Sequence, residues 1–183
     1  MNASVIIGRL LDSSVLNLEI FFLTLALGLP LGLIISFGTM SKWRPLSFLH
    51  CVKTNNPFLH KVFTFVGNFR PIRDITAIFV WIIRGTPLMV QLLIFYFVIL
   101  LPLGTPKFLA AVICFSLNSG AYVAEIVRGG IMSIDKGQME AGRSLGMSQL
   151  QTTWKIILPQ AMKNILPAIG NECIALLKET SVA

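Results

Sequence analysis

Seven polar or charged side chains stand inside otherwise apolar segments, and they are the residues through which this sequence could bind a small polar molecule. Asn118, Tyr122 and Glu125 are spaced i, i+4, i+7 and therefore share one face of a helix. A carboxylate there can pair with an ammonium or guanidinium group, and an amide can bind a carboxylate. The candidate substrate pathway comprises Gln91, Asn118, Tyr122, Glu125, Asn171, Glu172 and Lys178.

A structural role is the alternative for the same side chains. Burying polar groups in lipid is costly, so helices in a membrane hydrogen-bond them to one another or let them reach the interface. For Gln91, Asn118 and Asn171, hydrogen bonding between helices explains the polar side chain as well as contact with a substrate does. For Glu125 and Arg128, near the expected inner membrane edge, we favour the structural role.

The residue types exclude bond-making chemistry in the apolar segments. Those segments contain no histidine, and His50, Cys51 and His60 lack a fourth ligand at regular spacing, so we read them as loop residues and predict no metal site. Three cysteines at wide spacing do not predict a disulfide framework. No Gly-x-x-x-x-Gly-Lys-Ser/Thr run occurs, so any ATP is hydrolysed elsewhere. No catalytic residue is expected.

The composition defines the elements that must position these side chains. Of 183 residues, 55% are hydrophobic and 13% charged, with a mean hydropathy of +0.77, whereas a soluble domain carries about 25% charge. At about 20 residues per span, this length holds four or five membrane helices and no separate soluble domain. The expected spans are residues 15–37, 86–101, 108–125 and 164–183, the last still running at Ala183, with 75–83 as an interfacial lead-in.

Basic residues predict the orientation of these spans. Residues 41–84 carry seven basic side chains against Asp74, and the connection 126–163 carries five more, whereas the turn between the second and third spans has Lys107 alone. Positively charged loops stay in the cytoplasm, so we expect the N-terminus outside. The net charge of +7 is therefore an orientation signal and gives no support to nucleic-acid binding.

One motif in the connection 126–163 is specific. Glu140-Ala141-Gly142, three residues, Gly146, nine residues, then Ile156, one residue and Leu158-Pro159 resembles the EAA signature of ABC importer permeases. Gly142 in place of the second alanine is the departure. Glu140 to Leu145 predicts a helix, Gly146 suits positive φ, and Ser148 can cap the next helix.

Two further runs narrow the resemblance to the polar amino acid permeases of the histidine, glutamine and arginine uptake systems. Arg84-Gly85-Thr86-Pro87 is similar to the opening of their second span. We expect Arg84 to anchor the inner end of that span, Thr86 to cap it and Pro87 to lie in its first turn. Residues 117–129 are similar to their third span. The resemblance is loose over 15–40 and close over 75–183.

This resemblance implies an all-α polytopic bundle with a type I permease core, in one permease domain over 1–183, in the bacterial inner membrane. Relative to the family, residues 41–74 hold a basic cytoplasmic insertion, and a fifth core helix is missing, so we expect the chain to be truncated or to continue. The region 126–163 is expected to couple transport to an ATPase. The coupling residues are Glu140, Ala141, Gly142, Leu145, Gly146, Met147, Ile156, Leu158 and Pro159.

The resemblance also implies the partners and the activity. They are an ABC ATPase dimer that uses ATP and Mg, a second permease subunit, a substrate-binding protein, membrane lipid and a polar amino acid such as arginine or glutamine. The chain itself would bind no cofactor and catalyse no reaction. The alternatives are a small channel or scaffold without ATPase coupling, a membrane-embedded enzyme, and a permease that inserts without transporting.

Overall fold

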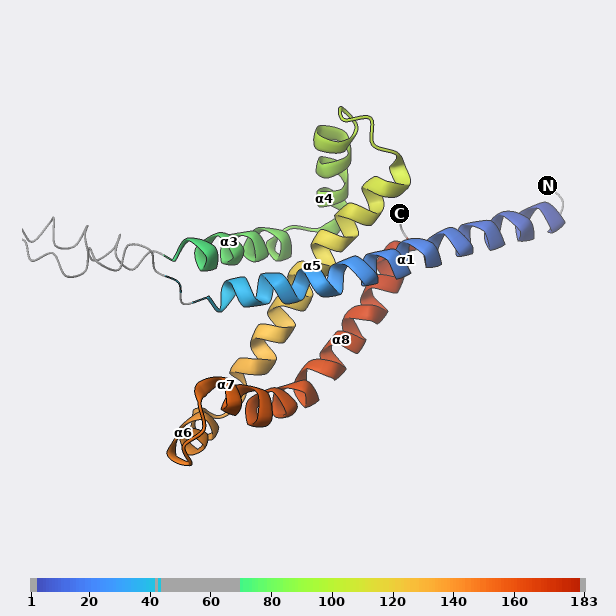
Figure 1. Ribbon diagram of the computed structural model, residues 1–183. Coiled ribbons are helices and arrows are strands. Elements are labelled where there is room, and N and C mark those ends of the chain that lie inside the picture. Colours follow the sequence, from blue (N-terminus) through green and yellow to red (C-terminus); the bar gives the residue numbers. More distant parts are fainter. Residues whose placement is uncertain (1–2, 42, 44–69, 182–183) are drawn as a thin grey trace, which may run out of the picture.

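The computed structural model describes residues 3–41, 43 and 70–181, and in this part of the chain the regular secondary structure consists of helices joined by short turns, without strands. The predicted insertion 41–74 lies largely outside the described residues, as do His50, Cys51 and His60. Figure 1 shows the arrangement of the helices. Their bounds are α1 Ala3–Thr39, α3 Pro71–Gly85, α4 Leu88–Ile94, η2 Phe95–Leu100, α5 Lys107–Met132, α6 Lys136–Ser144, α7 Gln149–Thr152, η3 Thr153–Ile157 and α8 Leu158–Thr180.

Helix α5 is the centre of the bundle, and α1 crosses it along a face of small residues. Thr24, Gly28, Gly32 and Ser36 recur every four residues, which puts them on one side of α1, and Thr24 and Ser36 are fully buried. A Cβ atom on Gly32 would lie 2.6 Å from Val123 of α5. Close approach of the two backbones therefore depends on glycine. The N-terminal part of α1 extends beyond the other helices (Figure 1).

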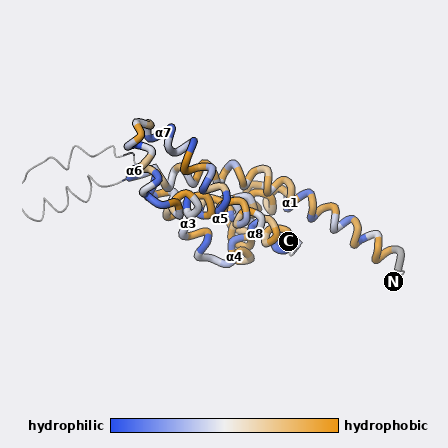
Figure 2. The backbone as a smooth tube through the Cα atoms, turned by 90° about the horizontal axis from the view of Figure 1, so that it is seen from below, coloured by the Kyte–Doolittle hydropathy of each residue, from blue (hydrophilic) through white to orange (hydrophobic). Residues whose placement is uncertain are grey.

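Helices α3, α4 and α8 also pack on α5, through apolar clusters. Phe115 is fully buried and packs with Leu176 of α8, while Val80 and Ile83 of α3 pack with Ala124. Figure 2 shows predominantly hydrophobic colouring along α1 and more hydrophilic colouring at α6. The apolar interior of the bundle is thus separate from a polar end formed by α6.

Chain direction changes sharply between α3 and α4. The axis of α3 makes an angle of 109° with the helix Leu88–Leu100. By length and composition, α1 and α5 are long and apolar enough to cross a membrane, and this bent pair is a third candidate among the described residues. The lead-in and the second expected span are therefore distinct helices meeting at a corner. The turn expected over 101–106 is present, with Gly104 at φ +69°.

Three expected helix ends differ from the structure. Helix α1 already begins at Ala3, whereas we expected its span to begin near residue 15. Helix α5 continues past Glu125 to Met132, and α8 begins at Leu158 instead of near Asn164. Both ends of the connection 126–163 are therefore helical extensions of their spans. We placed the ends where the hydropathy falls, whereas packing of Gly130 against Ile165 keeps both helices regular beyond that point.

Candidate functional site

Helices α6 and α7 form a compact hairpin whose turn is held by backbone and capping hydrogen bonds. The N–H of Met147 donates to the carbonyl of Gly142 (3.1 Å) and that of Gly146 to Arg143 (3.0 Å), which is the Schellman arrangement. Gly146 has φ +81°, a value that disfavours residues with a side chain. Ser148 and Gln151 then form a capping box at the start of α7. The helix, hinge and cap expected around Gly146 are all present.

The departure from the EAA pattern at Gly142 has a packing explanation. Gly142 is buried, and a Cβ atom there would lie 2.5 Å from Cγ2 and 2.8 Å from Oγ1 of Thr152, a fully buried residue of α7. The Thr152 hydroxyl also donates to the Ser148 carbonyl (3.0 Å), so its position is constrained. Glycine therefore lets α6 lie against α7 at this distance.

We expect Gly142→Ala to loosen the hairpin. Overpacking costs about 1–3 kcal/mol, and the better helix propensity of alanine offsets about 1 kcal/mol of it. A net loss of about 1 kcal/mol raises hydrogen exchange of the α6 and α7 amides about fivefold.

Thr152→Ala added to Gly142→Ala should restore slow exchange, because it removes the colliding atoms. Gly129→Ala is the matched control, since a Cβ atom at Gly129 meets nothing within 4 Å. If the hydrogen-exchange rates of Gly142→Ala are the same with and without Thr152→Ala, the contact between residues 142 and 152 does not determine the stability of the hairpin.

The hairpin and the η3 segment that follows it present large apolar side chains to their surroundings. Leu145 is 81% exposed, Leu150 72% and Trp154 67%. Glu140 and Ala141 are also exposed, whereas Met147, Ile156 and Leu158 are partly buried. An apolar surface on an otherwise polar element is typical of a protein-binding site.

Helices α7 and α8 are joined by a π-helical segment, η3, that leads directly into Pro159. The N–H of Leu158 donates to Thr153, five residues earlier, and Pro159 occupies the first turn of α8, where its missing N–H is tolerated. Pro159 therefore lies inside the last helix, whereas we expected that span to begin only near residue 164. The π segment was not anticipated; such segments are frequent at functional sites.

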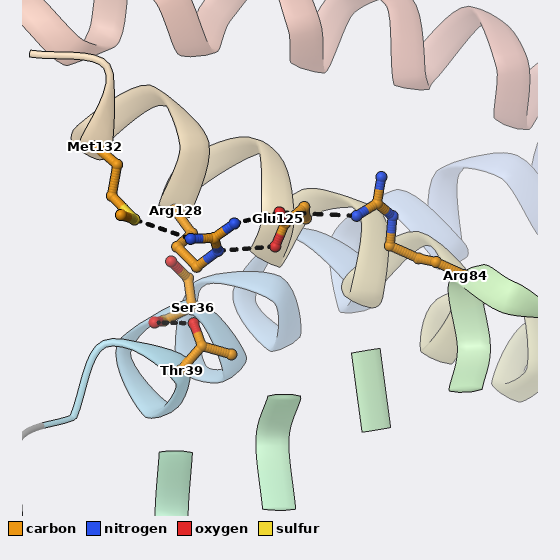
Figure 3. Close-up of polar contacts among 6 residues, drawn as sticks. All are labelled: Ser36, Thr39, Arg84, Glu125, Arg128 and Met132. Carbon is orange, nitrogen blue, oxygen red and sulfur yellow. Dashed lines mark hydrogen bonds and ion pairs between the residues drawn. The ribbon is translucent and has the colours of Figure 1, made fainter. Parts of the chain in front are cut away.

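Glu125 is the centre of an ionic network that joins α3 to α5 (Figure 3). Its carboxylate accepts hydrogen bonds from the Arg128 guanidinium, with Nε at 2.9 Å from Oε2. Nη1 of Arg84 lies 3.9 Å from Oε1, and the Arg84 guanidinium stands 5.2 Å from the centre of the Tyr122 ring. Arg128 also approaches the Met132 sulfur at 2.8 Å. This geometry favours the structural role for Glu125 and Arg128.

Gln91 closes the corner between α3 and α4. Its Nε2 donates to the carbonyl of Thr86 (2.9 Å), to the Thr86 hydroxyl (2.7 Å) and to the carbonyl of Ile83. Thr86 is the C-cap of α3 and Pro87 the N-cap of α4, each one step before the position we expected. The Arg84–Pro87 motif thus ends one helix and starts the next.

The seven expected pathway residues do not gather at one point. Tyr122 and Glu125 line a cavity of about 850 Å³ between α3, α5 and the end of α1. Asn118 is buried within the packing of α5. On α8, Glu172 is partly buried, while Asn171 and Lys178 are exposed. Their roles in a pathway stay predictions.

Three residues of interest were missed by sequence reasoning. Thr152 determines the spacing of the hairpin, and Arg70 and Arg73 line the same cavity as Glu125. For Arg70 and Arg73 the sequence holds a signal, because their spacing puts them on the same helix face as Arg84. Nothing local to Thr152 indicates its contact with Gly142.

Comparison with known proteins shows the family to which this chain belongs. Residues 63–183 match the family described as "Binding-protein-dependent transport system inner membrane component". The chain belongs to this family, whose members are membrane components of transporters and not enzymes, as we expected. Its membership and its apolar helices make it a multi-pass inner membrane protein.

Its relatives are amino acid permeases of ABC transporters. It is 39% identical over 175 residues to the arginine transport system permease protein ArtQ of Bacillus subtilis (strain 168), covering 94% of this chain and 68% of ArtQ. It is 45% identical over 119 residues to the L-cystine transport system permease protein TcyB of the same organism, covering 64% of this chain and 51% of TcyB. It is 43% identical over 111 residues to the glutamine transport system permease protein GlnP of Escherichia coli (strain K12), covering 59% of this chain and 51% of GlnP. The match thus spans about half the length of TcyB and GlnP.

Solved structures agree with the fold. A crystal structure of an amino acid ABC transporter with histidines matches at a TM-score of 0.75 and 35% identity, covering 100% of this chain and 75% of that one. The methionine ABC transporter MetNI matches at a TM-score of 0.52 and 19% identity, and this match supports the fold alone. The expected polar amino acid permease family and all-α membrane fold are therefore confirmed.

Proposed function

We propose that this chain is the permease subunit of an ATP-driven importer of polar amino acids, coupled through Glu140–Pro159 to a separate ATPase subunit. The observation that supports this most directly is the α6–α7 hairpin, whose turn is held by backbone and capping hydrogen bonds and which carries the exposed Leu145 and Leu150. The exposed Trp154 lies in η3, directly after the hairpin. A lever that transmits motion needs a stiff backbone and an apolar contact surface, and the hairpin combines the two.

Transport in this proposal proceeds by alternating access. ATP binding closes a dimer of ATPase subunits, the hairpins of two paired permeases move with it, and the pathway opens outward to a substrate-binding protein. A second permease subunit is required because the helices of one chain do not surround a pathway with two gates. ATP and Mg act in the ATPase, and the N-terminus of the permease lies outside.

The substrate class is proposed from the relatives and from the charges of the bundle. ArtQ is an arginine permease whose match covers 94% of this chain, whereas the GlnP and TcyB matches are shorter. Glu172, partly buried on α8, is the acidic residue best placed to attract a guanidinium, because Glu125 already bonds to Arg128. We therefore favour arginine over glutamine.

Leu145→Asp is expected to uncouple the chain from its ATPase. Burying a leucine in a partner pocket contributes about 2 kcal/mol, so its loss, with a buried charge added, weakens ATPase binding about thirtyfold or more. The measurement is capture of the ATPase subunit of the Bacillus subtilis arginine system by the purified chain. ATP-driven uptake of labelled arginine in proteoliposomes, with unlabelled glutamine as competitor, is measured in parallel.

Leu103→Asp is the matched control, because Leu103 is a leucine of similar exposure, 74% against 81% for Leu145, in the turn before α5. It should leave ATPase capture and uptake unchanged. Equal capture by the Leu145→Asp and wild-type chains would refute the coupling site. A channel or scaffold predicts uptake that does not require ATP.

A further inference from the structure

Three arginines of α3 lie on the same side of that helix. Arg70, at its N-cap, and Arg73 and Arg84 follow a spacing of i, i+3 and i+14, which returns each side chain to nearly the same direction. All three line the cavity of about 850 Å³. Thr39 and Met40 at the end of α1 and several residues of α5 line the other sides of this open cavity.

The described lining of this cavity is strongly positive. Arg70, Arg73, Arg84 and Arg128 contribute four positive charges and Glu125 one negative charge, a net of three positive charges. Glu125 interacts with Arg84 and Arg128, so the excess lies toward Arg70 and Arg73. An anion is the ligand whose charge complements this end, and guanidinium groups bind phosphate in bidentate fashion.

The neighbouring side of α3 is apolar and exposed. Ile75, Ile78 and Ile82 repeat at i, i+3 and i+7, and Trp81, which is 77% exposed, lies between them and the arginines and also lines the cavity. Isoleucines beside a row of arginines are typical of a helix in the membrane interface, with tryptophan at headgroup level. The 109° corner after α3 is consistent with this placement.

We propose that this cavity binds the phosphate headgroup of an anionic phospholipid, with Arg70 and Arg73 on the phosphate and the acyl chains along Trp81 and the isoleucines. A soluble anion such as inorganic phosphate shares the headgroup chemistry. The exposed apolar stripe beside the arginines favours the lipid, because a soluble anion gains nothing from it. The inference rests on the membrane placement of the chain and not on its ATPase or its substrate.

The test uses Trp81 as the reporter in the full chain. Trp43→Phe and Trp154→Phe leave Trp81 as the single tryptophan, and the protein is reconstituted in phosphatidylcholine bilayers containing brominated phosphatidylglycerol or brominated phosphatidylcholine, which quench fluorescence on contact. We expect quenching to report tighter binding of phosphatidylglycerol, and Arg70→Gln with Arg73→Gln to lower that preference about tenfold.

Arg9→Gln with Lys107→Gln is the matched control, since it removes two exposed positive charges outside the cavity. This control variant should bind phosphatidylglycerol in preference to phosphatidylcholine as strongly as the chain with all its arginines does. Equal quenching by the two lipids, or a preference that survives Arg70→Gln with Arg73→Gln, overturns the proposal. So does protection of Trp81 by millimolar inorganic phosphate, which would identify a soluble-anion site. ATPase capture is measured separately on an Arg70→Gln with Arg73→Gln chain that keeps Trp154, so failure here is distinguishable from failure of the coupling proposal.

Discussion

A leucine in place of Gly32 is expected to separate α1 from α5 and to destabilise the bundle by about 3 kcal/mol or more, the upper range for overpacking. The ideal Cβ position at Gly32 is 2.6 Å from Cβ and Cγ1 of Val123 and 2.9 Å from the carbonyl oxygen of Gly120. The last contact is with backbone, so a rotamer change cannot relieve it. Unfolding of the purified chain in a sodium dodecyl sulfate titration measures the loss.

Gly8→Leu in the same helix is the control for this substitution. A Cβ atom at Gly8 meets nothing within 4 Å, and the gain in helix propensity is the same for both glycines. The difference between the two variants therefore isolates the α1–α5 contact. If Gly32→Leu and Gly8→Leu unfold at the same detergent concentration, close packing at Gly32 is not what holds α1 in place.

Glu125→Gln is expected to destabilise the junction of α3 and α5 by about 2 kcal/mol. The side chains of Glu125, Arg128 and Arg84 are 29%, 33% and 40% exposed, so the loss is smaller than the 3–5 kcal/mol found when a fully buried pair is broken. Removing the carboxylate leaves two guanidinium groups near each other without the charge that neutralises them. The same detergent titration measures the effect, with the exposed Glu19→Gln of α1 as control.

A double-mutant cycle separates the structural role of Glu125 from substrate contact. In the structural case, Arg128→Gln combined with Glu125→Gln costs less than the sum of the two single changes, by about 1 kcal/mol. Additive losses would argue against the network. A variant of normal stability whose KM for arginine uptake rises would instead assign Glu125 to the pathway.

The hinge of the candidate coupling site was predictable because its determinants are close in sequence. Gly146 terminates α6 through its own backbone conformation, and Ser148 starts α7 through a capping box with Gln151. The four-residue spacing of the small residues on α1 likewise defines one helix face without knowledge of the partner that packs there. Helix ends were less predictable. Near Glu125 and Asn164 the sequence stops being apolar, but packing between α5 and α8 keeps both helices regular beyond those points.

The sequence by itself therefore determined that this is a membrane protein of the permease type and where its hinge is, because hydropathy, charge and capping act over a few neighbouring residues. It did not determine all four spans: among the described residues α1 and α5 are long and apolar enough to cross a membrane, residues 88–100 pass only together with α3, and α8 is not a candidate. The tertiary structure alone decided which distant side chains meet. It brings Arg84 of α3 to Glu125 of α5, places Thr152 against Gly142, and turns Gln91 back onto the end of α3. Those contacts depend on how helices cross, and crossing geometry follows from packing over the whole bundle.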